Sequence, residues 1–104
     1  MPGVDFKILR TEITMEQVLD RLGFQPTRRA GSQLHGPCPV HDSKSPGSRT
    51  FSVNLDDGRY YCHKCRSRGN QLELWAAVNK QSLYEAALDL CRVLGREVPW
   101  IERW

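Results

Sequence analysis

Two short motifs decide the fold of this 104-residue chain: Cys38-Pro39-Val40-His41 and, twenty residues further on, Cys62-His63-Lys64-Cys65. In each motif two metal-ligating residues are separated by two others, so that one tight turn can present both side chains to the same ion. Thiolate and imidazole ligands favour zinc, whereas Mg²⁺ and Ca²⁺ prefer oxygen ligands. The spacing therefore predicts one zinc ion, held by Cys38, His41, Cys62 and Cys65.

Four protein ligands leave no open position for water or substrate, so the predicted zinc site is structural and not hydrolytic. Three other interpretations stay open. His63 could replace His41 as the fourth ligand, although a residue inside such a turn points away from the ion that its neighbours bind. An iron–sulfur centre usually takes four cysteines and fits this ligand set less well. A zinc enzyme would need an open coordination position and is the least favoured interpretation.

The composition is that of one soluble globular domain, with 39% hydrophobic and 26% charged residues. No apolar run is long enough to span a membrane, and Asp5 and Lys7 interrupt the stretch where a secretory signal would need apolar residues. We therefore expect a cytoplasmic protein without membrane contact. Four cysteines in such a protein are better explained as metal ligands or reduced thiols than as disulfides.

The positive charge is concentrated in the middle of the chain. The net charge is only +3, but residues 26–70 contain eight Lys and Arg against three Asp and Glu. The remainder of the chain contains seven basic and nine acidic residues. The basic segment is also the segment that contains the two ligand motifs, which favours a polyanionic partner near the predicted zinc site.

Three helices are predicted from apolar stripes and capping residues. They cover residues 14–22, with Thr14 as N-cap and Gly23 as stop signal, residues 70–79, and residues 82–94, with Ser82 as N-cap. Cys91 lies on the apolar stripe of the third helix and is expected to be a buried core thiol.

Short strands are predicted between the first and second helices. Residues 25–48 are rich in Pro, Gly, Ser and basic residues, and we expect loops there with one strand at residues 33–35, His35 being a surface residue. Residues 50–55 alternate as a half-buried strand does. Asp57-Gly58 signals a two-residue hairpin turn, because Gly tolerates the positive φ that such a turn requires, and residues 59–62 form the returning strand. The acidic pair Asp56-Asp57 is explained by this turn.

These elements predict a small α+β domain, a zinc ribbon whose antiparallel sheet is flanked by helices. We expect the domain to cover residues 1–99, with the ribbon core at residues 33–70, and residues 100–104 to be a tail or the start of a linker.

Basic and aromatic side chains interleave around the second motif, as in proteins that bind a phosphate backbone and stack unpaired bases. Alternation places Tyr60 and Tyr61 on opposite faces of their strand, so that at most one is exposed and the other packs with Phe51 and Val53. The alternative is that the cations form a solvated face around the anionic zinc–thiolate centre. The candidate nucleic-acid contacts are Arg49, Arg59, Tyr61, His63, Lys64, Arg66 and Arg68.

The order of these motifs resembles the zinc-ribbon domain at the amino end of bacterial and phage DNA primases. The resemblance is carried by the two ligand motifs, by Ser45-Pro46 and Phe51-Ser52-Val53 between them, and by Gly69-Asn70 opening a helix. The later run Ser82-Leu83-Tyr84-Glu85 to Gly95-Arg96-Glu97-Val98-Pro99 is also similar. Two departures are a longer loop before Phe51 and the residues His63 and Arg66, where the family often has an aromatic residue and a glycine.

The resemblance implies a module that binds single-stranded template DNA and supports primer synthesis by a catalytic domain in the same or another chain. It also implies the replicative helicase as a candidate partner. Primases bind their catalytic metals through clustered carboxylates in a separate domain that these 104 residues do not include, so we do not expect this polypeptide to be an enzyme. The alternative is a stand-alone zinc-ribbon adaptor for a protein partner, anchored by Trp100 and Trp104, unless both tryptophans cover the domain's own helices.

Overall fold

The computed structural model describes residues 3–40 and 50–101. Their elements follow one another in the order β1 (Gly3–Val4), α1 (Phe6–Glu12), α2 (Met15–Leu22), β2 (Arg28–Ala30), β3 (Gln33–Gly36), β4 (Phe51–Asn54), β5 (Arg59–Cys62), β6 (Arg68–Asn70), α3 (Gln71–Asn79), α4 (Leu83–Leu94) and β7 (Trp100–Ile101). The expected α+β class with an antiparallel sheet is confirmed.

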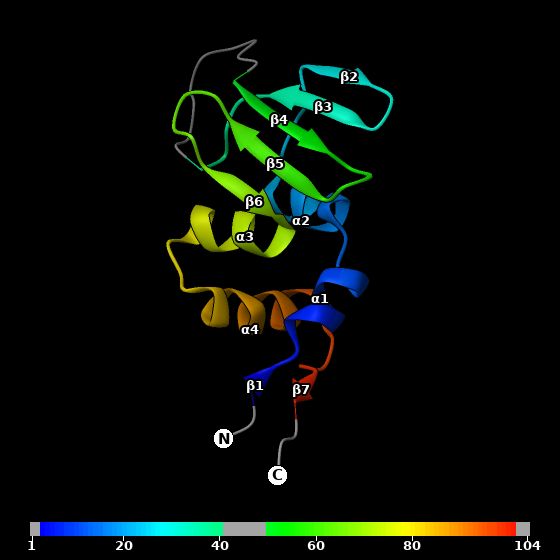
Figure 1. Ribbon diagram of the computed structural model, residues 1–104, viewed down its shortest axis with the longest axis vertical. Helices are drawn as coiled ribbons and strands as arrows, with labels where there is room; N and C mark the ends of the chain where they lie inside the picture. The colour runs from blue at the N-terminus through cyan, green and yellow to red at the C-terminus, as the bar shows by residue number, and fades with distance from the viewer. Residues whose placement is uncertain (1–2, 41–49, 102–104) are drawn as a thin grey trace.

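A five-stranded antiparallel sheet forms one end of the molecule, with the strand order β2-β3-β4-β5-β6. Helices α2 and α3 lie beneath it, α4 packs below α3, and α1 lies beside α4 (Figure 1). A second, two-stranded sheet pairs β1 with β7 at the opposite end. The chain is elongated as a result, with extents of 50 × 27 × 22 Å.

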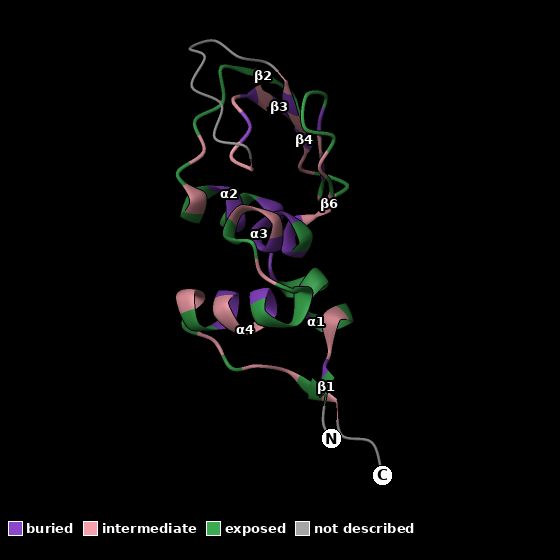
Figure 2. Cartoon of the chain, turned by 90° about the vertical axis from the view of Figure 1, so that its left-hand side faces the viewer, coloured by how far each residue is buried: buried purple, intermediate pink, exposed green. Residues whose placement is uncertain are grey.

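The hydrophobic core begins on the inner face of the large sheet. Leu34, Phe51, Val53 and Tyr60 alternate with more exposed neighbours along their strands and are buried. The Tyr60 ring stacks on Phe51 with ring centres 5.6 Å apart, as expected for the inward-facing tyrosine. The buried residues continue through α2 and α3 below the sheet (Figure 2).

The three predicted helices are confirmed, and each has a capping box. Thr14 with Gln17, and Ser82 with Glu85, exchange the expected pairs of side-chain and backbone hydrogen bonds. Asn70 with Glu73 does the same at the start of α3. Cys91 is buried on α4, as predicted.

The sequence-based assignment was incomplete in the segment expected to hold loops and one strand. β3 and β4 lie where strands were predicted, but β2 is an additional strand, joined to β3 by the two residues Gly31 and Ser32. β6 was also missed, because its three residues follow the turn of the second cysteine motif, end on Asn70, the N-cap of α3, and show no alternation. β1 and β7 were missed because two residues are too few to show a period, and β7 is a paired strand where a tail was expected. α1 was missed although its N-cap, Asp5, is a helix start signal.

The turn between β4 and β5 differs from the two-residue form that Asp57-Gly58 predicts. Four residues separate the paired Asn54 and Arg59. The Asn54 side chain accepts hydrogen bonds from the backbone N–H groups of Asp56 (2.9 Å) and Asp57 (3.2 Å), and this side-chain contact closes the longer loop. Gly58 has the expected positive φ, at +63°. The acidic pair therefore belongs to turn formation, as predicted.

Candidate metal centre and nucleic-acid interface

Three cysteines meet at one corner of the large sheet. Cys38 follows β3, Cys62 ends β5, and Cys65 lies in the turn between β5 and β6. Their sulfur atoms all lie within 4.8 Å of one another. β3 and β5 are both neighbours of β4, so the sheet itself brings together ligands that are 24 residues or more apart in sequence.

The second motif forms the tight turn that its spacing predicts. The Cys65 N–H donates to Cys62 Sγ at 3.4 Å, and the Arg66 N–H donates to the Cys62 carbonyl at 2.8 Å. Burial acts to raise the pKa of the Cys62 thiol, but hydrogen bonds from Cys65, Lys64 and Cys38 outweigh it and lower that pKa below its usual value. The turn thus favours the thiolate form, which is the form that binds metal.

The separation of two of the sulfurs suits a tetrahedral zinc ion. Cys38 Sγ and Cys65 Sγ are 3.8 Å apart, and two thiolates bound tetrahedrally at about 2.3 Å from zinc are separated by about 3.8 Å. A disulfide would bring the same atoms to about 2.0 Å. Cys38 and Cys62 are buried and Cys65 is exposed, so the cluster lies at the boundary between the hydrophobic core and solvent.

The fourth ligand predicted from the sequence, His41, lies outside the described residues. His63, the alternative, does not join the cysteine cluster. Its ring instead packs edge-on against Tyr61, with ring centres 4.8 Å apart. Cys91 is also separate from the cluster, and burial raises the pKa of its thiol.

The candidate nucleic-acid contacts lie on the outer face and the adjoining turn of the sheet. Tyr61 and Arg68 are cross-strand partners on β5 and β6. His63, Lys64 and Arg66 are exposed in the turn that holds the cysteines. Arg59 is exposed at the start of β5, and Arg49 lies outside the described residues.

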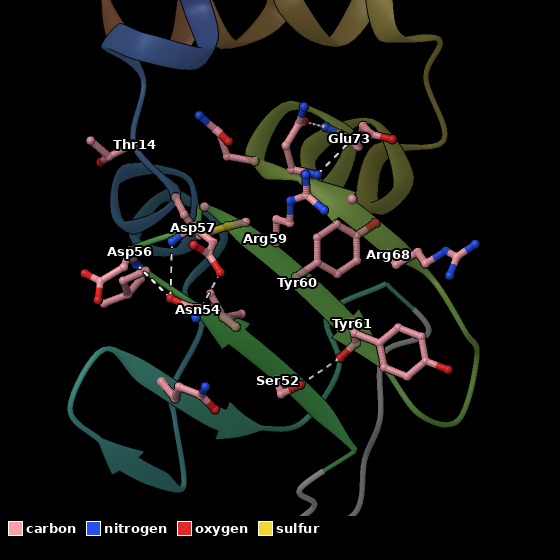
Figure 3. A pocket seen from close by; sticks show the side chains of 18 of the residues that line it. Thr14, Ser52, Asn54, Asp56, Asp57, Arg59, Tyr60, Tyr61, Arg68 and Glu73 are labelled. Carbon is pink, nitrogen blue, oxygen red and sulfur yellow. Dashed lines mark hydrogen bonds between the residues drawn. The ribbon is translucent and has the colours of Figure 1, made fainter.

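The strand register extends the pair of Tyr61 and Arg68 into a row across the whole sheet. Residues directly opposite each other in an antiparallel sheet share a face, and four successive pairings connect Arg28, His35, Ser52, Tyr61 and Arg68. We call these five residues the cross-strand row. Figure 3 shows Ser52, Tyr61 and Arg68 on three adjacent strands. The row carries a guanidinium at each edge of the sheet and two aromatic rings between them.

Sequence reasoning missed Arg28, His35 and Ser52 as members of this surface. These residues were missed because β2 was not predicted, although Gly31-Ser32 is a two-residue hairpin signal that indicates such a strand. Without β2 and the register, Arg28 is only one basic residue in a loop.

A groove of about 970 Å³ lies over β4, β5 and β6 and extends toward the start of α3. Its lining includes three arginines and three acidic residues, so the groove as a whole is not basic. The acidic residues belong to the β4–β5 turn and to α3, whereas the cross-strand row crosses the strands between them and the cysteine turn. An anion is therefore better accommodated along the row than along the full groove.

Fold and site together define a zinc-ribbon domain with a cysteine cluster beside an aromatic and basic sheet face. The family model of the CHC2 zinc finger, the zinc ribbon of DnaG, matches residues 4–103. The chain belongs to this family of bacterial DNA primase zinc fingers.

Similar proteins include the DNA primase of Synechococcus elongatus, 35% identical over 81 residues that cover 78% of this chain and 10% of that protein. The DNA primase of Escherichia coli K12 is 29% identical over 73 residues, which cover 70% of this chain and 12% of that protein. A crystal structure of the Aquifex aeolicus primase, comprising zinc-binding and RNA polymerase domains, matches with a TM-score of 0.71 and 25% identity. That match covers 92% of this chain and 23% of the other. The chain thus spans about a tenth of the length of the curated primases it matches.

No helix in residues 3–40 or 50–101 is long and apolar enough to cross a membrane.

Proposed function

We propose that this domain binds single-stranded template DNA along the cross-strand row and positions it for the catalytic domain of a primase, in the same or another chain. The observation that carries the proposal is the row itself. Tyr61 and His35 can stack on unpaired bases, while Arg28 and Arg68 at its two ends can contact phosphates. The remaining candidates, Arg49, Arg59, His63, Lys64 and Arg66, would add contacts beside the row.

We infer further that Cys38, His41, Cys62 and Cys65 hold one structural zinc ion. Support comes from the three clustered sulfurs, the tetrahedral separation of Cys38 Sγ and Cys65 Sγ, and the membership of the CHC2 family. When bound, the zinc supplies a fixed crosslink and no reaction chemistry. As ligands of that ion, the cysteines would tie the end of β5 to the residues that follow β3, and so would hold the sheet that carries the row.

Fluorescence anisotropy with short labelled oligonucleotides tests DNA binding at two or more salt concentrations. On a single strand, log K falls with log salt by about 0.7 for each phosphate contacted. We expect Arg28→Gln to weaken binding and to reduce this slope by about 0.7. Absent or salt-independent binding by the unmodified protein would contradict the proposal.

Arg29→Gln is the matched control. Arg28 and Arg29 are neighbours in the same edge strand and are both exposed, but Arg29 pairs with the buried Leu34 and so lies on the opposite face. The two variants have the same net charge. If both weaken binding equally, the effect reflects charge alone and the row is not the binding surface.

The adaptor alternative is supported by one observation: Trp100 is 46% exposed, at the end of the molecule opposite the large sheet (Figure 1). Trp104 lies outside the described residues. The same titration separates the two functions, because an adaptor for a protein partner predicts no salt-dependent binding of oligonucleotides.

A further inference from the structure

Arg66 has a backbone conformation that normally belongs to glycine. Its φ is +62°, in the left-handed region. Among the described residues seven have φ in the positive range, and five of them are glycines. A side chain is strained in this region because its Cβ approaches the following carbonyl oxygen, so glycine would be the relaxed residue at position 66.

The position cannot escape this conformation while the cysteine turn is intact. The Arg66 N–H closes the turn by donating to the Cys62 carbonyl at 2.8 Å. The next residue, Ser67, accepts from the Cys62 N–H at 2.9 Å through its own carbonyl. Both hydrogen bonds fix the backbone around Arg66, and both belong to the turn that presents Cys62 and Cys65.

Nothing in the described part of the chain explains why an arginine occupies this position. Its side chain is exposed, and the two ion pairs found among residues 3–40 and 50–101 join Arg92 to Asp89 and Arg96 to Glu12. Residues 59–70 contain four basic residues and no acidic residue, so Arg66 lies in a surface of like charge. Within the described residues, the arginine is therefore both strained and repelled.

The other exception, Lys80, has an explanation within the fold. It has φ +55° at the C-cap of α3, and its N–H donates hydrogen bonds to the carbonyls of Ala76 and Ala77 in the last turn of the helix. A cation there also complements the negative end of the helix dipole. Arg66 caps no helix, and no contact within residues 3–40 and 50–101 explains it.

We propose that Arg66 occupies this strained position because its guanidinium contacts a phosphate of the bound single strand. An arginine at position 66 thus strengthens DNA binding and lowers the stability of the cysteine turn. This inference rests on the proposed function. It adds that Arg66 contacts the phosphate backbone of the DNA and not a base, and that the domain does not need this arginine to fold. Arg66→Gly should therefore stabilise the protein while weakening its binding of DNA.

The experiment compares Arg66→Gly, Arg66→Lys and Lys80→Gly with the unmodified zinc-loaded protein. Thermal unfolding and zinc content are measured together with anisotropy titrations on oligo(dT) and oligo(dC). We expect Arg66→Gly to keep its zinc and to raise the melting temperature by about 4 °C. It should weaken binding about three- to tenfold at low salt, equally for both oligonucleotides, and reduce the salt slope by about 0.7. Arg66→Lys should retain the slope.

Lys80→Gly is the matched control, because it removes one positive charge and one left-handed side chain away from the sheet. It should leave DNA binding unchanged. If it weakens binding as much as Arg66→Gly does, or if Arg66→Gly binds normally, the inference is overturned while the proposed function stands. Loss of zinc or a lower melting temperature in Arg66→Gly also overturns it, since glycine would then not be the relaxed residue. An unmodified protein that binds no DNA refutes the proposed function first.

Discussion

At the scale of single residues, the junction between β6 and α3 requires a residue without a side chain. That residue is Gly69. It has φ +148°, and a Cβ built there would lie 2.7 Å from Cδ and 2.8 Å from Cβ of Glu73. Glu73 is itself committed, because it closes the capping box with Asn70 at the start of α3. β6 can therefore lead directly into α3 only with glycine at this position.

Gly69→Ala is expected to destabilise the fold by about 1 to 3 kcal/mol, because the backbone is strained and Glu73 must leave its cap. Urea unfolding at fixed zinc concentration measures this loss. Gly3→Ala is the control, since a Cβ there meets nothing within 4 Å and the backbone φ is not positive. A loss for Gly69→Ala no larger than that for Gly3→Ala would show that the junction is not as tight as described.

At the scale of elements, one buried side chain connects the start of α3 to the junction between α1 and α2. Gln71, the first residue of α3, is 5% exposed. Its amide nitrogen donates to the carbonyls of Arg10 (2.9 Å) and Ile13 (2.6 Å), where α1 ends and α2 is about to begin. Exposed carbonyls at a helix end normally turn to water or to a capping group. Gln71 supplies that group from a residue 58 or more positions away in sequence.

Gln71→Leu keeps the side-chain volume but leaves both carbonyls without this donor. The expected loss is about 1 to 3 kcal/mol of unfolding free energy, and hydrogen exchange should accelerate at the α1–α2 junction before it does in the large sheet. Gln25→Leu, at an exposed position between α2 and β2, makes the same chemical change and should cost less than about 0.5 kcal/mol. Equal losses in the two variants would remove Gln71 from this role.

At the scale of the whole molecule, the proposed zinc ion would be a crosslink between residues far apart in sequence. Structural zinc in small domains contributes about 10 to 16 kcal/mol of apparent binding free energy, against a total stability of about 5 to 15 kcal/mol for a typical domain. Cys38 and Cys62 are part of the continuous hydrophobic core as well as of the cysteine cluster. Loss of the metal should therefore disrupt the large sheet and not only the cysteine turn.

Cys65→Ser is expected to abolish stoichiometric zinc binding and to unfold the large sheet at 37 °C, as measured by elemental analysis and circular dichroism. The side chain is exposed, so little packing is lost with the sulfur. Cys91→Ser is the matched control: the same atom is exchanged, but Cys91 lies on α4 outside the cluster. Its variant should retain one zinc ion per chain. Zinc retention by Cys65→Ser, or an unchanged spectrum after chelation, would contradict the proposed metal site.

Local chemistry by itself determined the three main helices and the metal ligand candidates. Thr14, Ser82 and the apolar stripes that follow them act within a few residues, as do the two ligand pairs with their fixed spacing. Tyr60 and Tyr61 were assigned correctly to opposite faces for the same reason, since alternation along one strand is local. These features could be read from the sequence because their partners are near neighbours in the chain.

Only the tertiary structure decided which distant residues share a surface. Arg28 and Arg68 lie at opposite edges of one sheet because four strand pairings connect them, and a local turn signal such as Gly31-Ser32 fixes only one of these pairings. The pairing of β1 with β7 and the bonds from Gln71 to Arg10 and Ile13 are likewise invisible in sequence. The left-handed backbone of Arg66 could not be predicted from the sequence either, because the chain has arginine where the closed turn would favour glycine. Propensity acts over a few residues, whereas register and strain are properties of the packed chain.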